Sequence, residues 1–349
     1  MSSEHSPGVY FGMPEAEYHS DPALGSTDLK RLLTGGSVYW WQSPLNPDRE
    51  PEQPGKVAPH LTFGRAVHKR VLEGEDAFRD LYAALPTGDD LLVTDADLGK
   101  WFADRGVGKL PRSKAEKIEL ALYRDPTVRI LDDIVDSATR AGITLLPPEQ
   151  HQLILDAARL ITTSPDLAEA FLGGVPEVSI FWTDSVLGTP VRKKCRIDYL
   201  KVRGLGDLKS IGNTKDMPFD RACRAQIAGL RYDIQAAHYL EGRAALPALV
   251  AAGQVQGEHD PAWLQRVAAE EEVGWYWVFF HSGLPPQVWA AQLSPGNPIL
   301  DAAGADIAKA LATYRDFLLD FGPDNPWVIP AELHELELAD MPAWFAKAA

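Results

Sequence analysis

Three short segments with alternating apolar residues limit the fold most: EVSIFWTD (177–184), VRKKCRIDYLKV (191–202) and GDLKS (206–210). In the first of them, Val178, Ile180 and Trp182 occupy every second position. Alternate residues of a strand point to the same side of a sheet, so this spacing is typical of half-buried strands. Turn residues separate the first two segments. The pattern predicts three consecutive strands paired as hairpins.

Elsewhere in the chain, apolar residues recur every three or four positions, which predicts helices. We expect helices over about 28–33 after a cap at Ser26 or Thr27, over 61–74, in several stretches of 113–172, over 219–240 and over about 299–320. Within 219–240 one apolar stripe contains Cys223, Ile227, Leu230, Ile234 and Ala237. A later hairpin is expected over 273–294. Strands and helices together predict an α/β fold.

Acidic side chains occur on two of the predicted strands. We expect Lys194, Arg196 and Asp198 on one face of the second strand, with Cys195, Ile197 and Tyr199 on the other. In GDLKS, Asp207 and Lys209 share a face while Leu208 enters the core. A hairpin would bring Asp198 close to both. Two neighbouring carboxylates repel each other, and Mg²⁺ is a hard cation that such oxygens bind. A metal with a nearby lysine is suited to cleaving a phosphodiester.

Purely structural roles for these residues also remain open. An Asp-x-Lys sequence near a turn is common, and Asp207 with Lys209 could form a surface salt pair. The following helix places Gln235 and Tyr239 one turn apart, with Tyr232 on the same side. Beside an apolar stripe, such a group could equally be boundary packing.

Composition narrows the class of protein. Hydrophobic residues make up 45% and charged residues 24%, which is ordinary for a globular chain. The N-terminus has no signal-peptide pattern and no apolar run could span a bilayer, so we expect a cytoplasmic protein without membrane contact. Two cysteines, Cys195 and Cys223, exclude a four-cysteine iron–sulfur or zinc site made by one chain. The net charge of −15 argues against a protein that coats DNA.

The ordered motifs resemble a known family. Asp198, then Asp-Leu-Lys, then Gln-x-x-x-Tyr is similar to the RecB-like branch of the PD-(D/E)XK nucleases. The resemblance to the exonuclease VIII (RecE) family is more specific and is carried by YHSDPALGSTDLKRLL, FGRAVHKRVLE, EVSIFWTDSVLGTPVRKKCRIDYL, DLKS, YDIQAAHY and LELADMPAWF. It implies a PD-(D/E)XK core, a central mixed β-sheet flanked by helices. We expect one domain over 1–349, with a mainly helical insertion over 80–170 and a proline-punctuated tail over 323–349.

The resemblance also implies a metal site. His68, in the Gly-x-x-x-His that begins at Gly64, matches a metal-proximal histidine. Asp198 and Asp207 match the metal-binding carboxylates, and Leu208 can lend its backbone carbonyl. A histidine ligand suits Mn²⁺ better than Mg²⁺, so activity with both is expected. From the residues alone, a histidine on a helix rich in basic residues would be solvated or capping.

Further residues match the catalytic and DNA-positioning groups of the family. Lys209 matches the catalytic lysine, which acts with Asp198 and Asp207. Glu177 matches an acid near the metals. Gln235 and Tyr239, with Tyr232 beside them, match the motif that positions the DNA strand.

The function implied is a Mg²⁺-dependent exodeoxyribonuclease, a phosphodiester hydrolase. It would degrade one strand of linear double-stranded DNA from its end, 5′ to 3′, and leave 3′ single-stranded tails for phage or prophage recombination. The implied partners are double-stranded DNA ends, a RecT-like single-strand annealing protein and further copies of the chain in a ring-shaped homo-oligomer. Such a ring would hide a basic channel inside an acidic exterior.

Two rival functions were weighed against this one. A Cas4-like nuclease needs an iron–sulfur cluster, which two cysteines do not supply. A non-catalytic DNA-binding or assembly protein that keeps the fold remains the alternative. The intact Asp198, Asp207 and Lys209 argue against it.

Overall fold

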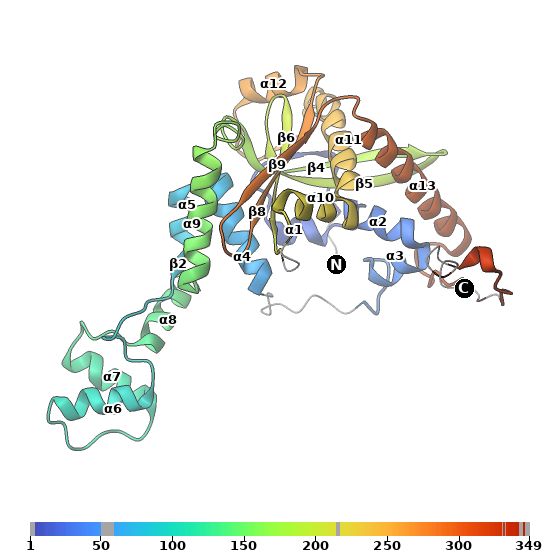
Figure 1. The fold of residues 1–349 in the computed structure, drawn as a ribbon. Coiled ribbons are helices and arrows are strands. Elements are labelled where there is room, and N and C mark those ends of the chain that lie inside the picture. Colours follow the sequence, from blue (N-terminus) through green and yellow to red (C-terminus); the bar gives the residue numbers. More distant parts are fainter. Residues whose placement is uncertain are drawn as a thin grey trace.

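The computed structural model describes residues 4–49, 59–213, 217–329, 331, 333–341 and 345. Within them lies a seven-stranded mixed sheet with the order β7-β1-β4-β5-β6-β8-β9 (Figure 1). Its strands are β1 (Gly8–Tyr10), β4 (Val175–Val186), β5 (Thr189–Leu200), β6 (Gly204–Ile211), β7 (Val255–Gln256), β8 (Gly274–His281) and β9 (Val288–Leu293). The pairs β1–β7 and β6–β8 are parallel, and the other neighbours are antiparallel. The expected α/β fold with a central mixed sheet flanked by helices is confirmed.

The described chain has helices on both faces of this sheet and others in an arm that projects from it. They are α1 (Glu15–Ser20), α2 (Ser26–Thr34), α3 (Gly36–Gln42), α4 (Pro59–His68), α5 (Glu75–Leu81), α6 (Asp95–Asp104), α7 (Lys114–Arg124), α8 (Leu131–Arg140), α9 (Pro148–Thr163), α10 (Phe219–Gly229), α11 (Tyr232–Ala251), α12 (Pro261–Ala269) and α13 (Pro298–Phe321). A π-helical turn, Lys69–Glu73, continues α4, and a short 3₁₀ turn covers Leu338–Asp340. The strands β2 (Tyr82–Ala84) and β3 (Thr144–Leu146) pair in parallel outside the main sheet.

The three strands expected between 177 and 210 form the centre of the sheet. Strand β4 pairs with β5 along its length, for example Ile180 with Cys195. Strand β5 then pairs with β6 near their connection, Tyr199 opposite Gly206. The hairpin expected over 273–294 is also present, as β8 and β9. Because β5 and β6 are adjacent, their polar residues meet.

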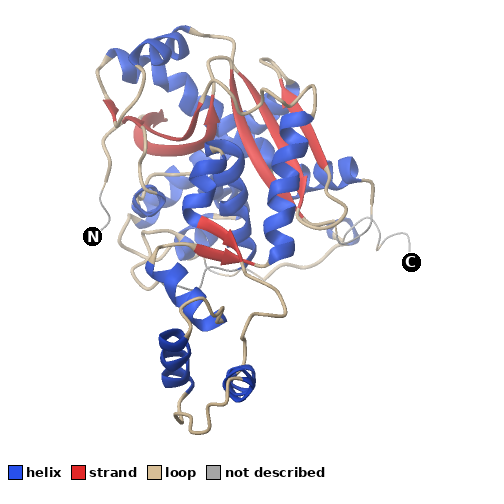
Figure 2. Cartoon of the chain, turned by 90° about the vertical axis from the view of Figure 1, so that its left-hand side faces the viewer, coloured by secondary structure: helices blue, strands red, loops and turns tan. Residues whose placement is uncertain are grey.

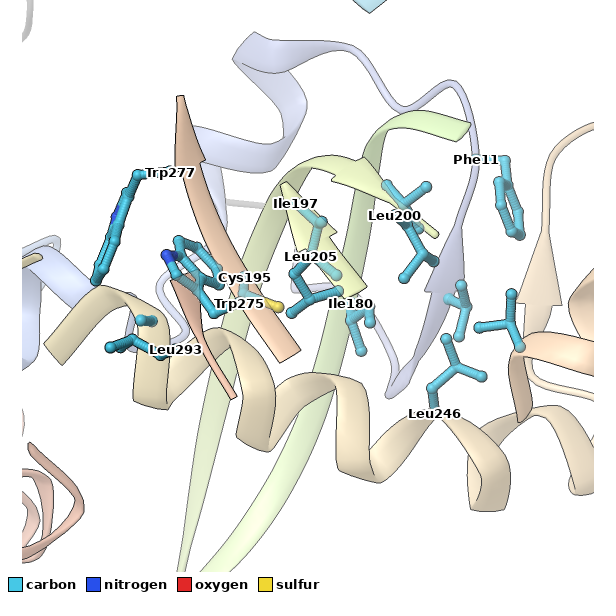
Figure 3. Packing of buried hydrophobic residues seen from close by; sticks show 14 of the residues in the cluster. Phe11, Ile180, Cys195, Ile197, Leu200, Leu205, Leu246, Trp275, Trp277 and Leu293 are labelled. Carbon is cyan, nitrogen blue, oxygen red and sulfur yellow. The ribbon is translucent and has the colours of Figure 1, made fainter. Parts of the chain in front are cut away.

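Two apolar clusters lie on opposite faces of the sheet. One contains Val178, Ile197 and Trp277 and packs beneath α11 and α12. Figure 3 shows part of it, with Leu205 and Trp275 from neighbouring strands above a helix that carries Leu246. The other cluster packs the opposite side chains of β6 and β8 against α4 and α9. At about 25 cal/mol per Å² of buried apolar surface, these two layers are the main stabilising contribution.

Three local expectations were wrong. Neither Ser26 nor Thr27 caps the first helix, because α2 begins at Ser26 and its N-cap is Gly25, whose N–H donates to Asp28. The single helix expected over 219–240 is two helices, α10 and α11, because Arg231 has a left-handed backbone (φ 51°) that ends one and starts the other. Leu230 consequently leaves the predicted stripe and is exposed. Tyr199 was placed with Cys195 and Ile197, yet it packs in the cluster on the opposite face. The regular alternation of β5 therefore ends after Ile197.

An arm, residues 85–142, projects from the sheet. Figures 1 and 2 show helices α6 and α7 at its far end. It has its own small apolar cluster, centred on Leu98, Trp101 and Phe102. The neighbouring helix α9 instead packs against the sheet through Ile154 and Ile161. Residues 80–170 thus contribute to two separate clusters.

Near the C-terminus, Trp327 is buried against α3 and α13. Trp344, also in the expected tail, is outside the described residues. No described helix is long and apolar enough to cross a membrane.

Candidate functional site

The β5–β6 hairpin joins the two expected carboxylates. The backbone N–H of Leu208 donates to Asp198 Oδ2 at 3.0 Å, which holds Asp198 beside β6. Lys209 Nζ donates to Asp207 Oδ1 at 2.7 Å. Burial and the negative charge of Asp207 raise the pKa of Asp198 to about 6. Such a rise is the signature of two carboxylates that share a poorly solvated space.

Helix α11 adds an amide and aromatic groups to this cluster. Gln235 Nε2 donates to Asp207 Oδ1 at 2.8 Å, and both side chains are buried. The Lys209 ammonium lies 5.2 Å from the centre of the Tyr232 ring, within the range of a cation–π contact. Tyr239 packs edge-on against Trp275, with ring centres 5.7 Å apart. Of the three α11 residues, Gln235 therefore contacts a carboxylate directly, and Tyr232 contacts the lysine bonded to that carboxylate. Burial and nearby negative charges, those of both carboxylates among them, raise the pKa of Tyr239.

His68 approaches the same carboxylates from the other side of β6. It is the last residue of α4, directly before the π-helical turn. Its Nε2 lies 2.8 Å from the carbonyl oxygen of Leu208 and 3.8 Å from Asp198 Oδ2. Its Nδ1 lies 3.7 Å from Glu177 Oε1. Burial alone would lower the pKa of His68, but Asp198 and Glu177 together raise it to about 9. The imidazole is therefore positively charged at neutral pH.

Glu177 is held by a residue that was not expected in the site. Arg196 Nε donates to Glu177 Oε2 at 2.6 Å, and its Nη1 donates to the Ser179 hydroxyl at 3.1 Å. Glu177 has a left-handed backbone (φ 56°), which is unusual inside a strand. The alternation of the strand predicted that Arg196 and Asp198 share one face, and this spacing was the sequence signal that could have placed Arg196 in the site.

Lys30, on α2, is a second residue that sequence reasoning missed. Its ammonium lies 5.3 Å from the Tyr232 ring centre, so Lys30 and Lys209 both contact one aromatic ring. Burial and the positive charge of Lys209 lower the pKa of Lys30 to about 8. No carboxylate within the described residues forms an ion pair with Lys30. Lys30 is far from the β6 residues of the site in the sequence, so no sequence pattern indicated that it would lie beside them.

The fit of a metal ion can be judged from Asp207. Its Oδ1 accepts two hydrogen bonds, whereas Oδ2 is buried and has no partner among the described residues. A buried carboxylate oxygen without a donor is costly, and a hard cation would satisfy it. However, no three His, Cys, Asp or Glu side chains of the described chain are arranged to hold a metal. The donor types fit Mg²⁺ or Mn²⁺, and Asp207 Oδ2 is the oxygen that a cation would satisfy.

The structure thus brings together all the residues expected at the site. They are His68, Glu177, Asp198, Asp207, Leu208, Lys209, Tyr232, Gln235 and Tyr239. Their roles as metal ligands, catalytic groups or DNA-positioning groups stay predictions. Taken as a whole, the cluster offers carboxylate oxygens, hydrogen-bond donors in Lys209 and Gln235, and a further positive charge in Lys30.

Comparison with known proteins gives distant structural likeness alone. No protein-family model and no curated protein sequence matches the chain. The crystal structure of a "putative exonuclease" from Eubacterium rectale resembles it with a TM-score of 0.44 and 11% identity over 88% of each chain. The crystal structure of SSO0001 resembles it with a TM-score of 0.22 and 10% identity, over 70% of this chain and 84% of the other. Because both TM-scores are below 0.5, function has to be argued from the site.

Proposed function

We propose that the protein is a metal-dependent exodeoxyribonuclease with a PD-(D/E)XK core. It would degrade one strand of linear double-stranded DNA from its end, 5′ to 3′. The observation that carries this proposal is the meeting of Asp198 and Asp207 on adjacent strands, with Lys209 bonded to one of them. Two carboxylates can bind a metal that activates a phosphodiester and a water molecule, and a lysine beside them can stabilise the negative charge that develops. The order of motifs in the sequence supports the same function.

Asp198, Asp207, His68 and the Leu208 carbonyl are the proposed ligands of Mg²⁺ or Mn²⁺. When bound, the metal would supply Lewis-acid activation of the phosphate and of a water molecule. His68 would first have to release its proton, because a protonated imidazole cannot bind a metal. The unpartnered Oδ2 of Asp207 supports this assignment.

Lys209 is best suited to act as a hydrogen-bond donor. Burial would lower its pKa, but Asp207 and Asp198 together raise it above the ordinary value. A lysine held positive orients a nucleophile and stabilises negative charge on the phosphate rather than accepting a proton. Gln235 fixes Asp207, and Tyr239 and Tyr232 line the space where a DNA strand would lie.

The proposal extends to partners that the site alone does not specify. A ring-shaped homo-oligomer would place the acidic residues of a chain of net charge −15 outside and the site inside. The 3′ tails would be passed to a RecT-like annealing protein during phage or prophage recombination in a bacterial cytoplasm.

The test compares end-labelled linear duplex with covalently closed circular DNA in Mg²⁺, in Mn²⁺ and with a chelator. Linear duplex bearing a 5′-phosphate is compared with duplex lacking it. We expect metal-dependent loss of the linear duplex and intact circles. Rapid cutting of closed circles would contradict the exonuclease assignment, and cleavage in the chelator would contradict the metal.

A non-catalytic DNA-binding protein is the second candidate. It is favoured by the arrangement in which Lys209 and Asp207 form a direct ion pair and no described group of side chains is ready for a metal. The two candidates differ in one measurement. A non-catalytic protein would bind DNA ends without cleaving them under any metal condition.

A further inference from the structure

One loop of the arm is basic and lies outside the candidate site, although residues 85–142 as a whole contain eleven acidic and nine basic residues. The loop of residues 105–113, here called the basic loop, connects α6 to α7. No acidic residue lies between Asp104 and Glu116, although the whole chain has a net charge of −15. Lys109 and Arg112 are exposed, and neither has an ion-pair partner within the described part of the chain.

Three acidic residues near the basic loop are already engaged, whereas the side chain of Asp104, directly before the loop, forms no hydrogen bond or ion pair in the described chain. Asp95 bonds to Lys117, and Asp97 bonds to the Thr94 and Val93 amides at the start of α6. Glu116 accepts a hydrogen bond from the hydroxyl of Ser113, at the start of α7. Helix capping and ion pairs therefore occupy Asp95, Asp97 and Glu116, and no described acid forms an ion pair with either exposed cation of the loop.

The loop is held in place by the arm's own core. Val107 and Leu110 pack against the cluster around Trp101, so their side chains turn inward. Arg105 stacks on the Trp101 ring, with its guanidinium carbon 4.0 Å from the ring centre. A loop anchored in this way loses little freedom when it binds a ligand.

Backbone donors complete the surface. The N–H groups of Gly108, Lys109, Leu110 and Arg112 have no hydrogen-bond partner among the described residues. Cationic side chains next to free backbone N–H groups are the donors that contact phosphate oxygens in protein–DNA complexes. A membrane surface would also need exposed apolar anchors beside the charges, and both large apolar residues of the loop face the core.

We propose that the basic loop binds the phosphate backbone of duplex DNA, outside the candidate active site. The choice of DNA among phosphate-bearing partners rests on the proposed nuclease function, whereas the anion-binding surface stands on the arm alone. Figure 1 shows α6 and α7 far from the sheet. Binding of the duplex at the basic loop would therefore raise the affinity for DNA without contacting the phosphodiester that is cleaved.

The test uses the full-length protein, a chelator to prevent cleavage, and a labelled dumbbell duplex of about 30 base pairs whose two ends are closed by loops. Because this duplex has no free end, its binding does not require the exonuclease site. Affinity is measured between about 50 and 200 mM salt. The variant Lys109→Ala/Arg112→Ala is compared with Lys100→Ala/Arg140→Ala, which removes the same charge elsewhere on the arm.

Each lost phosphate contact lowers the slope of log affinity against log salt by about 0.9. We expect Lys109→Ala/Arg112→Ala to lower it by about 1.8, to weaken binding about tenfold at the lower salt concentration, and to keep the wild-type melting temperature. We expect the control to keep the wild-type slope.

Three results would overturn the inference: equal slopes for both variants, no binding of the closed duplex by the wild type, or a loss of binding to phosphatidylserine vesicles with unchanged DNA binding. If the wild type binds closed duplex through the loop but cleaves no linear DNA, the proposed function fails and this inference stands.

Discussion

The imidazole Nε2 of His68 lies 2.8 Å from the carbonyl oxygen of Leu208, although 140 residues separate them in the chain. A carbonyl oxygen only accepts, so Nε2 carries the proton in this contact. Both partners were expected to be metal ligands, and here they bind each other. A metal bound to His68 Nε2 would have to take the place of this proton.

His68→Gln tests this competition. The glutamine amide can still donate to the Leu208 carbonyl but lacks the imidazole nitrogen, so we expect weaker Mn²⁺ binding, slower cleavage and a retained fold. Calorimetry with Mn²⁺ and a nuclease assay check it. His19→Gln, on the exposed end of α1, is the matched control. Unchanged Mn²⁺ affinity with full activity would remove His68 from the ligand set.

Asp207→Asn and Lys209→Ala separate an enzyme from a binding protein. The first removes a charge from the buried carboxylate pair, and the second removes the donor bonded to it. We expect each to slow cleavage about 100-fold or more, because charge-stabilising groups in active sites have effects of that size. Binding to DNA ends should persist, since most contacts to DNA involve phosphates elsewhere.

The measurement is the cleavage rate beside the affinity for DNA ends. Asp207 is fully buried, so the two residues are not the surface pair that the sequence left open. A buried pair that serves only the fold would lose about 3–5 kcal/mol of stability when one partner is removed, and it would contribute nothing to catalysis. Wild-type cleavage by either variant would show that Asp207 and Lys209 are such a pair.

Lys30 gives a prediction that only the structure supplies. It has no carboxylate partner within the described residues and lies beside the same Tyr232 ring as Lys209. We expect Lys30→Ala to lower kcat/KM about 10- to 100-fold, the loss of one hydrogen bond to a charged group. Lys30→Arg should restore part of it. Lys309→Ala, an exposed lysine on α13, is the control. Equal kinetics for Lys30→Ala and wild type would place Lys30 outside the substrate's path.

The three central strands were predictable because their alternation is local, and their pairing followed from short turns. That spacing also placed Asp198, Asp207 and Lys209 together, since β5 and β6 are consecutive. The position of Lys30 was not predictable, because it depends on how α2 packs against α11. The break at Arg231 was missed for a different reason. The three- and four-residue spacing of apolar residues in the sequence is not interrupted at Arg231, so this spacing alone does not reveal the left-handed residue that separates α10 from α11.

Tyr239→Phe tests the role of helix α11. The change removes one hydroxyl and keeps the ring packed against Trp275. We expect a loss of about 0.5–1.5 kcal/mol in transition-state stabilisation, much less than for Asp207→Asn. Tyr239→Ala should also lower thermal stability, because it leaves a space beside Trp275. Melting curves and DNA cleavage rates check both. If neither variant changes cleavage, the Gln235–Tyr239 pair only supports the fold.

His238 sets how the stability depends on pH. It is fully buried on α11, and its Nε2 lies 2.9 Å from the Lys194 carbonyl oxygen. Its Nδ1 has no hydrogen-bond partner in the described chain and lies 3.9 Å from Glu241 Oε2. Burial and the nearby Lys193 ammonium lower the pKa of His238 to about 3. In the unfolded chain the pKa is about 6.5, so the unfolded state binds more protons between these values.

The free energy of unfolding should therefore fall as pH drops from about 6.5 towards 3, by up to about 1.4 kcal/mol per pH unit from this group. Above pH 6.5 the histidine is neutral in both states and contributes no slope. His238→Gln keeps a donor for the Lys194 carbonyl and does not titrate, so its stability should fall less steeply over the same range. Urea unfolding of both proteins between pH 4.5 and 7.5 measures the difference, with His19→Gln as the exposed control. Identical slopes for His238→Gln and the wild type would show that His238 is not held neutral in the fold.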